Sequence, residues 1–170
     1  ELDMQRAFNI AGADTKLVAI RNRLPGQLEA SLAELEKQLK KAQIFALAGG
    51  FSAGDEPDGS GKFITAFFRN PEIKEGVTEL LDKNDGLICG ICNGFQALIK
   101  LGLVPYGKII DTDENCPTLT FNTIARHQSK IVRTRVASNK SPWLKGVNVG
   151  DILNVPISHG EGRFYADEAL

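Results

Sequence analysis

Residues 86–96 of the chain read Gly-Leu-Ile-Cys-Gly-Ile-Cys-Asn-Gly-Phe-Gln. The apolar run over residues 86–91 is short and bounded by glycine, which is typical of a strand buried on both faces. Residues 93–101 are then predicted as a helix that ends at Gly102, because glycine readily takes the left-handed conformation that follows a helix. A strand that passes directly into a helix is the basic unit of an α/β fold.

The segments before this unit show the same alternation of strand and helix. Leucines recur from Leu28 to Leu39 with charged residues between them, and their spacing predicts a helix with one buried stripe. Further helices are expected near residues 2–12, 63–69 and 72–82, and further strands over residues 17–20 and 43–48. This order predicts an α/β fold with an open, mostly parallel sheet and helices on both faces.

The last third of the chain has a different pattern, without a helix of useful length. Residues 118–123, 129–137 and 151–158 are strand-like, and an antiparallel extension of the parallel sheet is the simplest interpretation. Because there is no internal repeat or linker, we interpret residues 1–170 as a single domain.

Composition excludes several classes of protein. The 170 residues are 42% hydrophobic and 24% charged, with a formal net charge of -1. Proteins that bind nucleic acid or membrane surfaces need a basic excess or a basic face, so we expect neither partner. No apolar stretch approaches the roughly 20 residues that cross a bilayer. Since the first residues include no apolar signal segment, a cytoplasmic location with three reduced cysteines is expected.

The glycine-flanked Cys92 is the sharpest candidate for chemistry. A nucleophile held between two glycines where a strand becomes a helix is the nucleophile elbow of many hydrolases, and a helix N-terminus favours the thiolate. A structural cysteine in an ordinary strand-turn-helix is the plain alternative. The Cys89-x-x-Cys92 spacing also leaves open a redox pair, or half of a zinc site completed by Cys116, His127 or His159.

A cysteine nucleophile needs a base, and the chain has two histidines. His159 follows an apolar strand, and in an extended chain Glu161 points to the same side, where it could orient the ring. Cys92, His159 and Glu161 thus make a candidate triad. His127 lies in a polar turn, which favours a surface or hydrogen-bonding role. The glycines on both sides of Glu161 indicate close approach to another group, or a simple turn.

Residues 49–52 read Gly-Gly-Phe-Ser and follow the predicted strand over residues 43–48. Small residues leave backbone N–H groups free to face an anion, as an oxyanion hole requires. A phosphate-binding loop is a poorer interpretation, because residues 59–62 lack its first glycine at the required spacing.

Taken together, residues 90–96 and His-Gly-Glu at 159–161 resemble the elbow and the end of a class I, triad-type glutamine amidotransferase domain, which has a flavodoxin-like fold. Within that class, the chain closely resembles the C-terminal glutaminase domain of large-type phosphoribosylformylglycinamidine synthases, enzymes of purine biosynthesis. The stretches that support this resemblance are residues 49–63, 117–122, 141–143 and 158–164.

The resemblance implies a domain that hydrolyses glutamine and passes ammonia to a synthetase domain. It makes Cys92 the nucleophile, His159 the general base and acid, and Glu161 the residue that orients His159. It also implies oxyanion contacts at Gly50, Phe51 and Asn93, and contacts to the substrate glutamine at Gly49, Gln96, Phe121 and Asn122.

The resemblance implies no metal or cofactor in this domain. ATP and Mg²⁺ belong to the synthetase domain, which converts formylglycinamide ribonucleotide to formylglycinamidine ribonucleotide. The chain lacks an initiator Met and the strand with which the family begins, so it is interpreted as a fragment of a larger synthase. A catalytically idle domain on the same scaffold and a cysteine hydrolase of other specificity are the alternatives.

Overall fold

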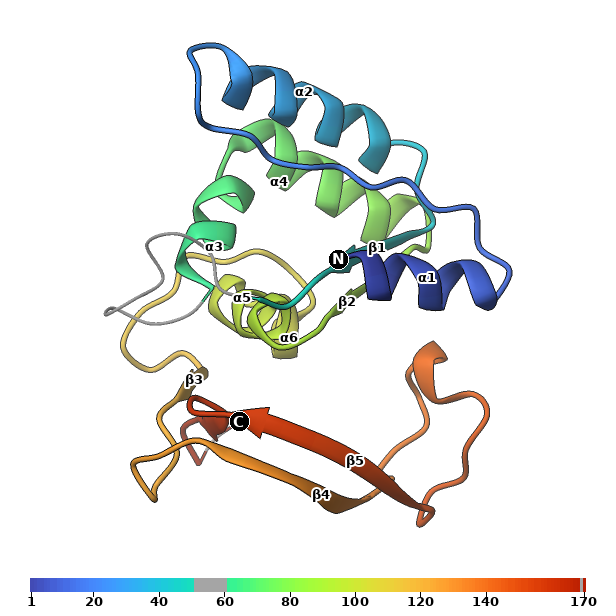
Figure 1. Ribbon diagram of the computed structural model, residues 1–170, viewed down its shortest axis with the longest axis vertical. Helices are drawn as coiled ribbons and strands as arrows, with labels where there is room; N and C mark the ends of the chain where they lie inside the picture. The colour runs from blue at the N-terminus through green and yellow to red at the C-terminus, as the bar shows by residue number, and fades with distance from the viewer. Residues whose placement is uncertain (51–60, 169) are drawn as a thin grey trace. The chain divides into compact units, whose positions relative to one another are not determined.

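The computed structural model describes residues 1–50, 61–168 and 170, which form two compact units. The first unit comprises Glu1–Leu119 and Phe164–Leu170, and the second comprises Thr120–Arg163. Figure 1 shows the chain coloured from its N-terminus to its C-terminus.

Most elements of the first unit are helices, as the sequence predicts. They are α1 (Leu2–Ile10), α2 (Gln27–Leu39), α3 (Lys62–Phe68), α4 (Pro71–Thr78), the π-helical turn η1 (Glu79–Lys83), α5 (Asn93–Leu101) and the short α6 (Leu103–Tyr106). Its strands β1 (Ile44–Leu47) and β2 (Leu87–Gly90) are both predicted from the sequence. The short strands β3 (Thr118–Thr120) and β6 (Arg163–Tyr165) pair where the chain passes between the units.

The strands β1 and β2 form a parallel pair. Ile44 lies opposite Leu87, and Leu47 lies opposite Gly90. The ladder continues beyond both strands, because the backbone N–H of Ile91 donates to the carbonyl oxygen of Leu47 over 3.0 Å. In Figure 1, α2 and α4 lie on one side of this pair, and α5 and α6 lie on the other. The predicted α/β class with parallel strands is therefore confirmed.

The predicted strand over residues 17–20 is wrong. This segment has no regular secondary structure and belongs to none of the sheets formed by the described residues. Val18 and Ile20 are half-buried against the core, whereas Leu17 is exposed. The apolar pattern thus reports packing against the helices, while a strand additionally requires a neighbour that supplies backbone donors and acceptors.

The hydrophobic core of the first unit joins α2 to α4. The predicted stripe is confirmed, since Leu35 and Leu39 are buried and Leu28 and Leu32 are half-buried. The two helices approach closely at Gly76, where a Cβ atom would lie 3.2 Å from Leu39 Cδ1. The largest fully buried side chains are Leu39, Ile73, Val77, Leu80, Ile99 and Leu101.

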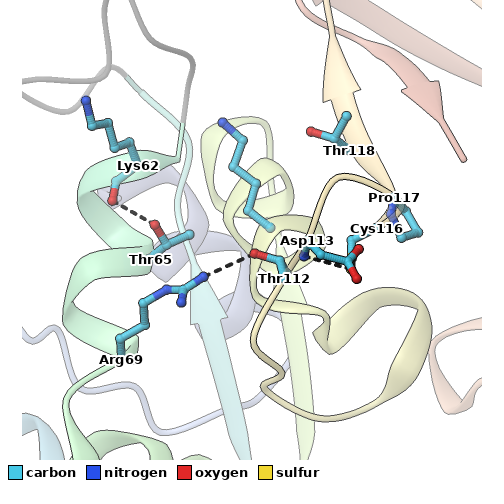
Figure 2. A pocket seen from close by; sticks show the side chains of 9 residues that line it. Lys62, Thr65, Arg69, Thr112, Asp113, Cys116, Pro117 and Thr118 are labelled. Atoms are coloured by element: carbon cyan, nitrogen blue, oxygen red, sulfur yellow. Dashed lines mark hydrogen bonds between the residues drawn. The ribbon is translucent and has the colours of Figure 1, made fainter.

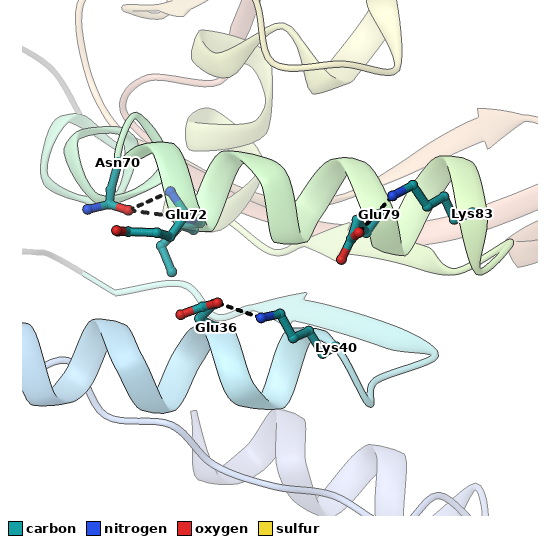
Figure 3. A network of polar contacts seen from close by, with 7 residues as sticks. Glu36, Lys40, Asn70, Glu72, Glu79 and Lys83 are labelled. Carbon is teal, nitrogen blue, oxygen red and sulfur yellow. Dashed lines mark hydrogen bonds and ion pairs between the residues drawn. The ribbon is translucent and has the colours of Figure 1, made fainter.

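The start of α4 is defined by Asn70. The side-chain oxygen of Asn70 accepts hydrogen bonds from the backbone N–H groups of Glu72 and Ile73, over 3.0 and 3.3 Å. Pro71 occupies the first helical position, where its missing N–H costs nothing. Figure 3 shows this cap at the beginning of the helix.

Figure 3 shows two ion pairs, one at the end of α2 and one on η1. Glu36 and Lys40 approach to 2.6 Å, and Glu79 and Lys83 approach to 2.7 Å. The hydrogen bond that Lys40 donates to Glu36 raises the pKa of Lys40, and the hydrogen bond that Lys83 donates to Glu79 lowers the pKa of Glu79. Because these side chains are exposed to water, the pairs add little to stability.

The second unit is built on an antiparallel pair, β4 (Gln128–Arg135) and β5 (Ile152–His159), with the 3₁₀ turn η2 (Pro142–Leu144) between them. Gln128 lies opposite His159, and Arg135 lies opposite Ile152. The predicted antiparallel strands are therefore present, and among the described residues they pair with each other instead of adding to β1 and β2. The register places His159 at the end of β5.

None of the described helices combines the length and the apolar character that crossing a membrane requires.

Candidate active site

Cys92 stands at the turn between β2 and α5, as the elbow pattern predicts. It is the N-cap residue of α5, with φ 54° and ψ -113°, and the residue is exposed. A positive φ is rare for a residue with a side chain and costs on the order of 1–3 kcal/mol. The turn is closed by a hydrogen bond of 2.9 Å from the Gly94 N–H to the carbonyl oxygen of Ile91.

The two glycines that flank Cys92 are required by close backbone contacts. A Cβ atom on Gly90 would lie 2.6 Å from the carbonyl carbon and oxygen of Gly94. A Cβ atom on Gly94 would overlap the carbonyl oxygen of Leu47 in β1. The elbow is therefore held between the start of α5 and the neighbouring strand.

The glycine pair after β1 lies beside this elbow. A Cβ atom on Gly49 would lie 2.8 Å from the Cβ of Cys92, so the backbone of Gly49 borders the nucleophile directly. Gly50 has φ 111° and is exposed, and a Cβ atom on it would meet none of the described residues within 4 Å. Phe51, the third residue of the predicted oxyanion strand, lies outside the described residues.

Two further predicted residues lie on the first turns of α5. Asn93 is buried, and Gln96 is half-buried, with its backbone N–H donating to the carbonyl oxygen of Cys92 over 3.0 Å. The structure thus brings together in the first unit the residues Gly49, Gly50, Cys92, Asn93 and Gln96.

The other cysteines have different surroundings. Cys89 lies within β2 and is half-buried, and its burial raises the pKa of its thiol. Cys116 is half-buried, and its thiol lies 3.4 Å from Asp113 Oδ1. All three cysteines are free thiols. Within the described ranges, no group of three or more cysteine, histidine or carboxylate side chains is arranged to hold a metal ion.

His159 and its surroundings belong to the second unit. The half-buried imidazole Nδ1 lies 3.0 Å from Oδ1 of Asn122, which is itself buried. The backbone N–H of Asn122 donates to the carbonyl oxygen of Gly160 over 2.9 Å, so Asn122 is also hydrogen-bonded to the turn that follows β5. A Cβ atom on Gly162 would overlap the His159 ring, so one of the two glycines around Glu161 permits close approach.

The remaining predicted residues of the second unit differ in exposure. Glu161 is half-buried, and Phe121 is 64% exposed. His127 is exposed, and its Nε2 lies 2.9 Å from the Ser158 hydroxyl, which confirms the predicted hydrogen-bonding role. The sequence did not identify Asn122 as a neighbour of His159, because the two residues are far apart in the chain and meet only through the turns.

A separate polar cavity of about 230 Å³ lies in the first unit. Figure 2 shows Arg69 pointing toward Thr112, whose hydroxyl lies 3.3 Å from the guanidinium. The residues that line the cavity are Lys62, Thr65, Arg69, Lys100, Thr112, Asp113, Cys116, Pro117 and Thr118. No predicted triad residue is among them, so this cavity is distinct from the elbow.

A family model of the CobB/CobQ-like glutamine amidotransferase domain matches residues 1–170. The elbow, the α/β fold and this match agree, and the chain belongs to the CobB/CobQ-like glutamine amidotransferase domain family. The resemblance identified from the sequence is thereby confirmed.

Several known proteins are similar over nearly the whole chain. Phosphoribosylformylglycinamidine synthase subunit PurQ of Methanococcus maripaludis is 35% identical over 168 residues, covering 99% of this chain and 56% of that protein. The Treponema denticola subunit PurQ is also 35% identical, covering 97% of this chain and 59% of its own length. The phosphoribosylformylglycinamidine synthase of Dictyostelium discoideum is 30% identical, covering 98% of this chain and 11% of that protein.

A solved structure, that of PurLQS from Thermotoga maritima, has the same fold. It superposes with a TM-score of 0.68 at 25% identity, covering 98% of this chain and 63% of the other. The chain spans little more than half the length of the PurQ relatives given above.

Proposed function

We propose that the chain is a glutaminase that supplies ammonia for the synthesis of formylglycinamidine ribonucleotide. The observation that carries this proposal is the elbow, in which Cys92 has φ 54° at the N-terminus of α5 and is bordered by Gly49. A cysteine that is exposed at a helix N-terminus and held there by a strained backbone is suited to nucleophilic attack. Membership of a glutamine amidotransferase family and the PurQ relatives support glutamine as the substrate.

In the first step, the Cys92 thiol gives its proton to His159, and the sulfur attacks the carboxamide carbon of glutamine. The electron pair of the C=O bond moves to oxygen and forms a tetrahedral oxyanion. Backbone N–H groups of Gly50, Phe51 and Asn93 are proposed to bind this oxyanion. Each such donor typically contributes about 10²–10³ in rate.

In the second step, His159 returns the proton to the leaving nitrogen, and ammonia departs from a glutamyl thioester. Water then loses a proton to His159 and attacks the thioester carbon, which releases glutamate and restores the thiol. Glu161 is proposed to orient His159. Gly49, Gln96, Phe121 and Asn122 are proposed to contact glutamine.

The partner in this proposal is a synthetase that uses ATP and Mg²⁺ to activate formylglycinamide ribonucleotide. The similarity to the PurLQS structure of Thermotoga maritima supports such an assembly. The chain itself needs no cofactor for glutamine hydrolysis, since the proposed chemistry uses only side chains, backbone groups and water. The reaction is proposed to occur in the cytoplasm.

Covalent labelling tests the nucleophile. The chain is treated with 6-diazo-5-oxo-norleucine, a glutamine analogue that alkylates an active-site thiol with loss of N₂, and the adduct is mapped by mass spectrometry. We expect the adduct on Cys92, no adduct in Cys92→Ser, and normal labelling in the matched Cys89→Ser control. An adduct on Cys89 or Cys116 contradicts the assignment, and labelling by iodoacetamide but not by the analogue supports a different hydrolase or an idle domain.

Glutamine turnover, measured with and without the synthetase, tests the base. His159→Ala is expected to lower kcat by about 10²–10⁴-fold, the usual contribution of a general acid–base group. His127→Ala is the matched control and should leave most turnover, because His127 is exposed and its Nε2 is hydrogen-bonded to the Ser158 hydroxyl and not to a proposed catalytic side chain. Equal losses in the two variants contradict the assignment of His159.

A further inference from the structure

The polar cavity of the first unit has the size of a small ligand. Its volume of about 230 Å³ gives room for roughly seven water molecules, at about 30 Å³ for each water in the liquid. Drug-sized ligands need about 300–1,000 Å³, so a compact ligand is the better match. The walls of the cavity are α3, the end of α5 and the chain that joins α6 to β3, all of which belong to the first unit.

Positive charge predominates in the lining of this cavity. The cationic side chains are Lys62, Arg69 and Lys100, and the one carboxylate among the lining residues is Asp113, which leaves a formal net charge of +2. The backbone N–H of Asn115 donates to Asp113 Oδ1 over 2.9 Å, so this carboxylate is already stabilised within its own loop. A cavity lined mainly by one sign of charge concentrates ions of the opposite sign.

Arg69 and Thr112 bring hydrogen-bond donors to one place in the cavity. The Arg69 Nη2 donates to the Thr112 hydroxyl oxygen over 3.3 Å, as Figure 2 shows. Within the part of the chain that the structure describes, this is the one hydrogen bond of the Arg69 side chain, which forms no ion pair there. A guanidinium has five N–H donors, and a hydroxyl that accepts a bond keeps its own hydrogen to donate. Both side chains can therefore donate to the same anion.

The cations around these donors come from two helices. Lys62 and Arg69 are seven residues apart, close to two turns, so they lie on one side of α3. Lys100 is the last residue but one of α5. Groups that approach from two helices and a loop suit an anion with oxygens in several directions, as in a tetrahedral phosphate, better than a planar carboxylate.

We infer that this cavity binds the dianionic phosphate group of a small ligand. A phosphate monoester carries about −1.5 to −2 charges at pH 7 and three strong acceptor oxygens. This charge matches that of the lining, and the oxygens match the donors of Arg69 and Thr112. The inference goes beyond the proposed function, because no triad residue lines the cavity and binding there needs no glutamine hydrolysis.

Alkylation of Cys116 reports whether the cavity is filled, because this half-buried thiol is part of the lining. The whole chain is treated with iodoacetamide in the presence of inorganic phosphate, ribose 5-phosphate, ribose or acetate, with the ionic strength held constant by KCl. Mass spectrometry of the peptides gives the rate at each cysteine. We expect inorganic phosphate, ribose 5-phosphate or both to slow alkylation of Cys116 several-fold and saturably. Cys89, which lies in β2 and not in the lining, is the internal control and should be unaffected.

The arms of this experiment separate the possible ligands. Stronger protection by ribose 5-phosphate assigns the site to a phosphate ester, and stronger protection by inorganic phosphate assigns it to the free ion. Either result supports a phosphate site. Equal protection by acetate, protection by ribose alone, or no protection by either phosphate compound overturns the inference.

Calorimetric titration of the better phosphate compound into variants tests the donors. Arg69→Ala should weaken binding about tenfold or more, as expected when a hydrogen bond to a charged group is lost. Arg69→Lys retains the charge and should recover part of this loss. Arg6→Ala is the matched control, because it removes the same charge from an exposed position on α1 outside the lining. Equal effects of Arg69→Ala and Arg6→Ala overturn the inference.

A second pair of variants tests the hydroxyl with little change in side-chain volume. Thr112→Val should weaken binding, whereas Thr112→Ser, which retains the hydroxyl, should bind nearly as well as the unmodified chain. Circular dichroism shows whether each variant is folded. Unchanged binding in both Thr112→Val and Arg69→Ala overturns the site. Since none of these measurements uses glutamine turnover, an inactive chain would contradict the proposed function and leave this test intact.

Discussion

At residue 92 the backbone accepts a conformation that few residues with side chains adopt. Its φ of 54° is maintained because the glycines on either side leave no room for a relaxed alternative: Gly90 contacts the backbone of Gly94, and Gly94 contacts the backbone of Leu47. The strain is thus maintained by packing of the elbow against β1. Exposure of Cys92 follows from the same geometry, because the turn raises its side chain above the sheet.

At the same scale, the two glycines around Glu161 should respond differently to an added methyl group. A Cβ on Gly162 would overlap the His159 ring, whereas a Cβ on Gly160 would meet no atom within 4 Å in the part of the chain that the structure describes. Gly162→Ala is therefore expected to displace the imidazole and lower kcat by about 10²-fold, and Gly160→Ala should change kcat little. Steady-state glutamine hydrolysis by both variants measures this difference. Similar activity of the two variants would show that the ring is not held against Gly162.

Among the elements, α4 shows how a few side chains define a helix. Asn70 caps two backbone N–H groups, Pro71 begins the helix, and Gly76 lets Leu39 of α2 approach. The ion pairs on the exposed faces contribute little by comparison, since water and salt screen them. Local order at this end of α4 therefore depends chiefly on the cap.

Removing this cap should have a measurable cost. Asn70→Ala is expected to lower the free energy of unfolding by about 1 kcal/mol, the usual value for an N-cap asparagine. Urea unfolding followed by circular dichroism measures the change. Asn84→Ala is the control, because Asn84 is exposed at the end of η1 and only its backbone N–H makes a hydrogen bond among the described residues. Equal effects of the two substitutions would argue against the capping contacts.

For the whole molecule, stability depends on the buried contacts of the first unit. Its core joins side chains of α2, α4, η1 and α5, and five of its large side chains are fully buried: Leu39, Ile73, Val77, Leu80 and Leu101. The second unit has fewer buried residues, and strand side chains such as Ile131 are 73% exposed. Burial of apolar side chains therefore stabilises the first unit, which contains Cys92, more than it stabilises the second unit.

Leu39 is the most informative position for testing this core. Leu39 is 1% exposed and touches α4 at Gly76, so Leu39→Ala should cost about 2–5 kcal/mol, the range for a buried leucine that leaves a cavity. The control is Leu2→Ala, since Leu2 is 67% exposed on α1. Urea midpoints at constant slope provide the comparison. A loss below 1 kcal/mol at Leu39 would mean that the α2–α4 contact is not part of the cooperative core.

Much of the fold and of the elbow followed from the sequence alone, because the signals are local. Helix periodicity predicted the stripe from Leu28 to Leu39, and glycine spacing predicted the turn at Cys92, since both depend on backbone geometry over a few residues. The relation of His159 to Asn122 did not follow, because it joins residues from two separate turns. The lack of regular structure at residues 17–20 could not be predicted either, since an apolar pattern indicates burial but not whether a neighbouring strand supplies hydrogen bonds.

The sequence by itself therefore determined the class of fold, the family and the candidate nucleophile, because each of them follows from short motifs and from the spacing of residues within them. The tertiary structure decided which buried polar atoms meet. The amide of Asn122 could have faced water or substrate, and only the placement of two carbonyl groups and one N–H around it gives it a single orientation toward His159. Hydrogen bonds of this kind depend on distances between segments remote in the chain, and such distances arise only when the chain has folded.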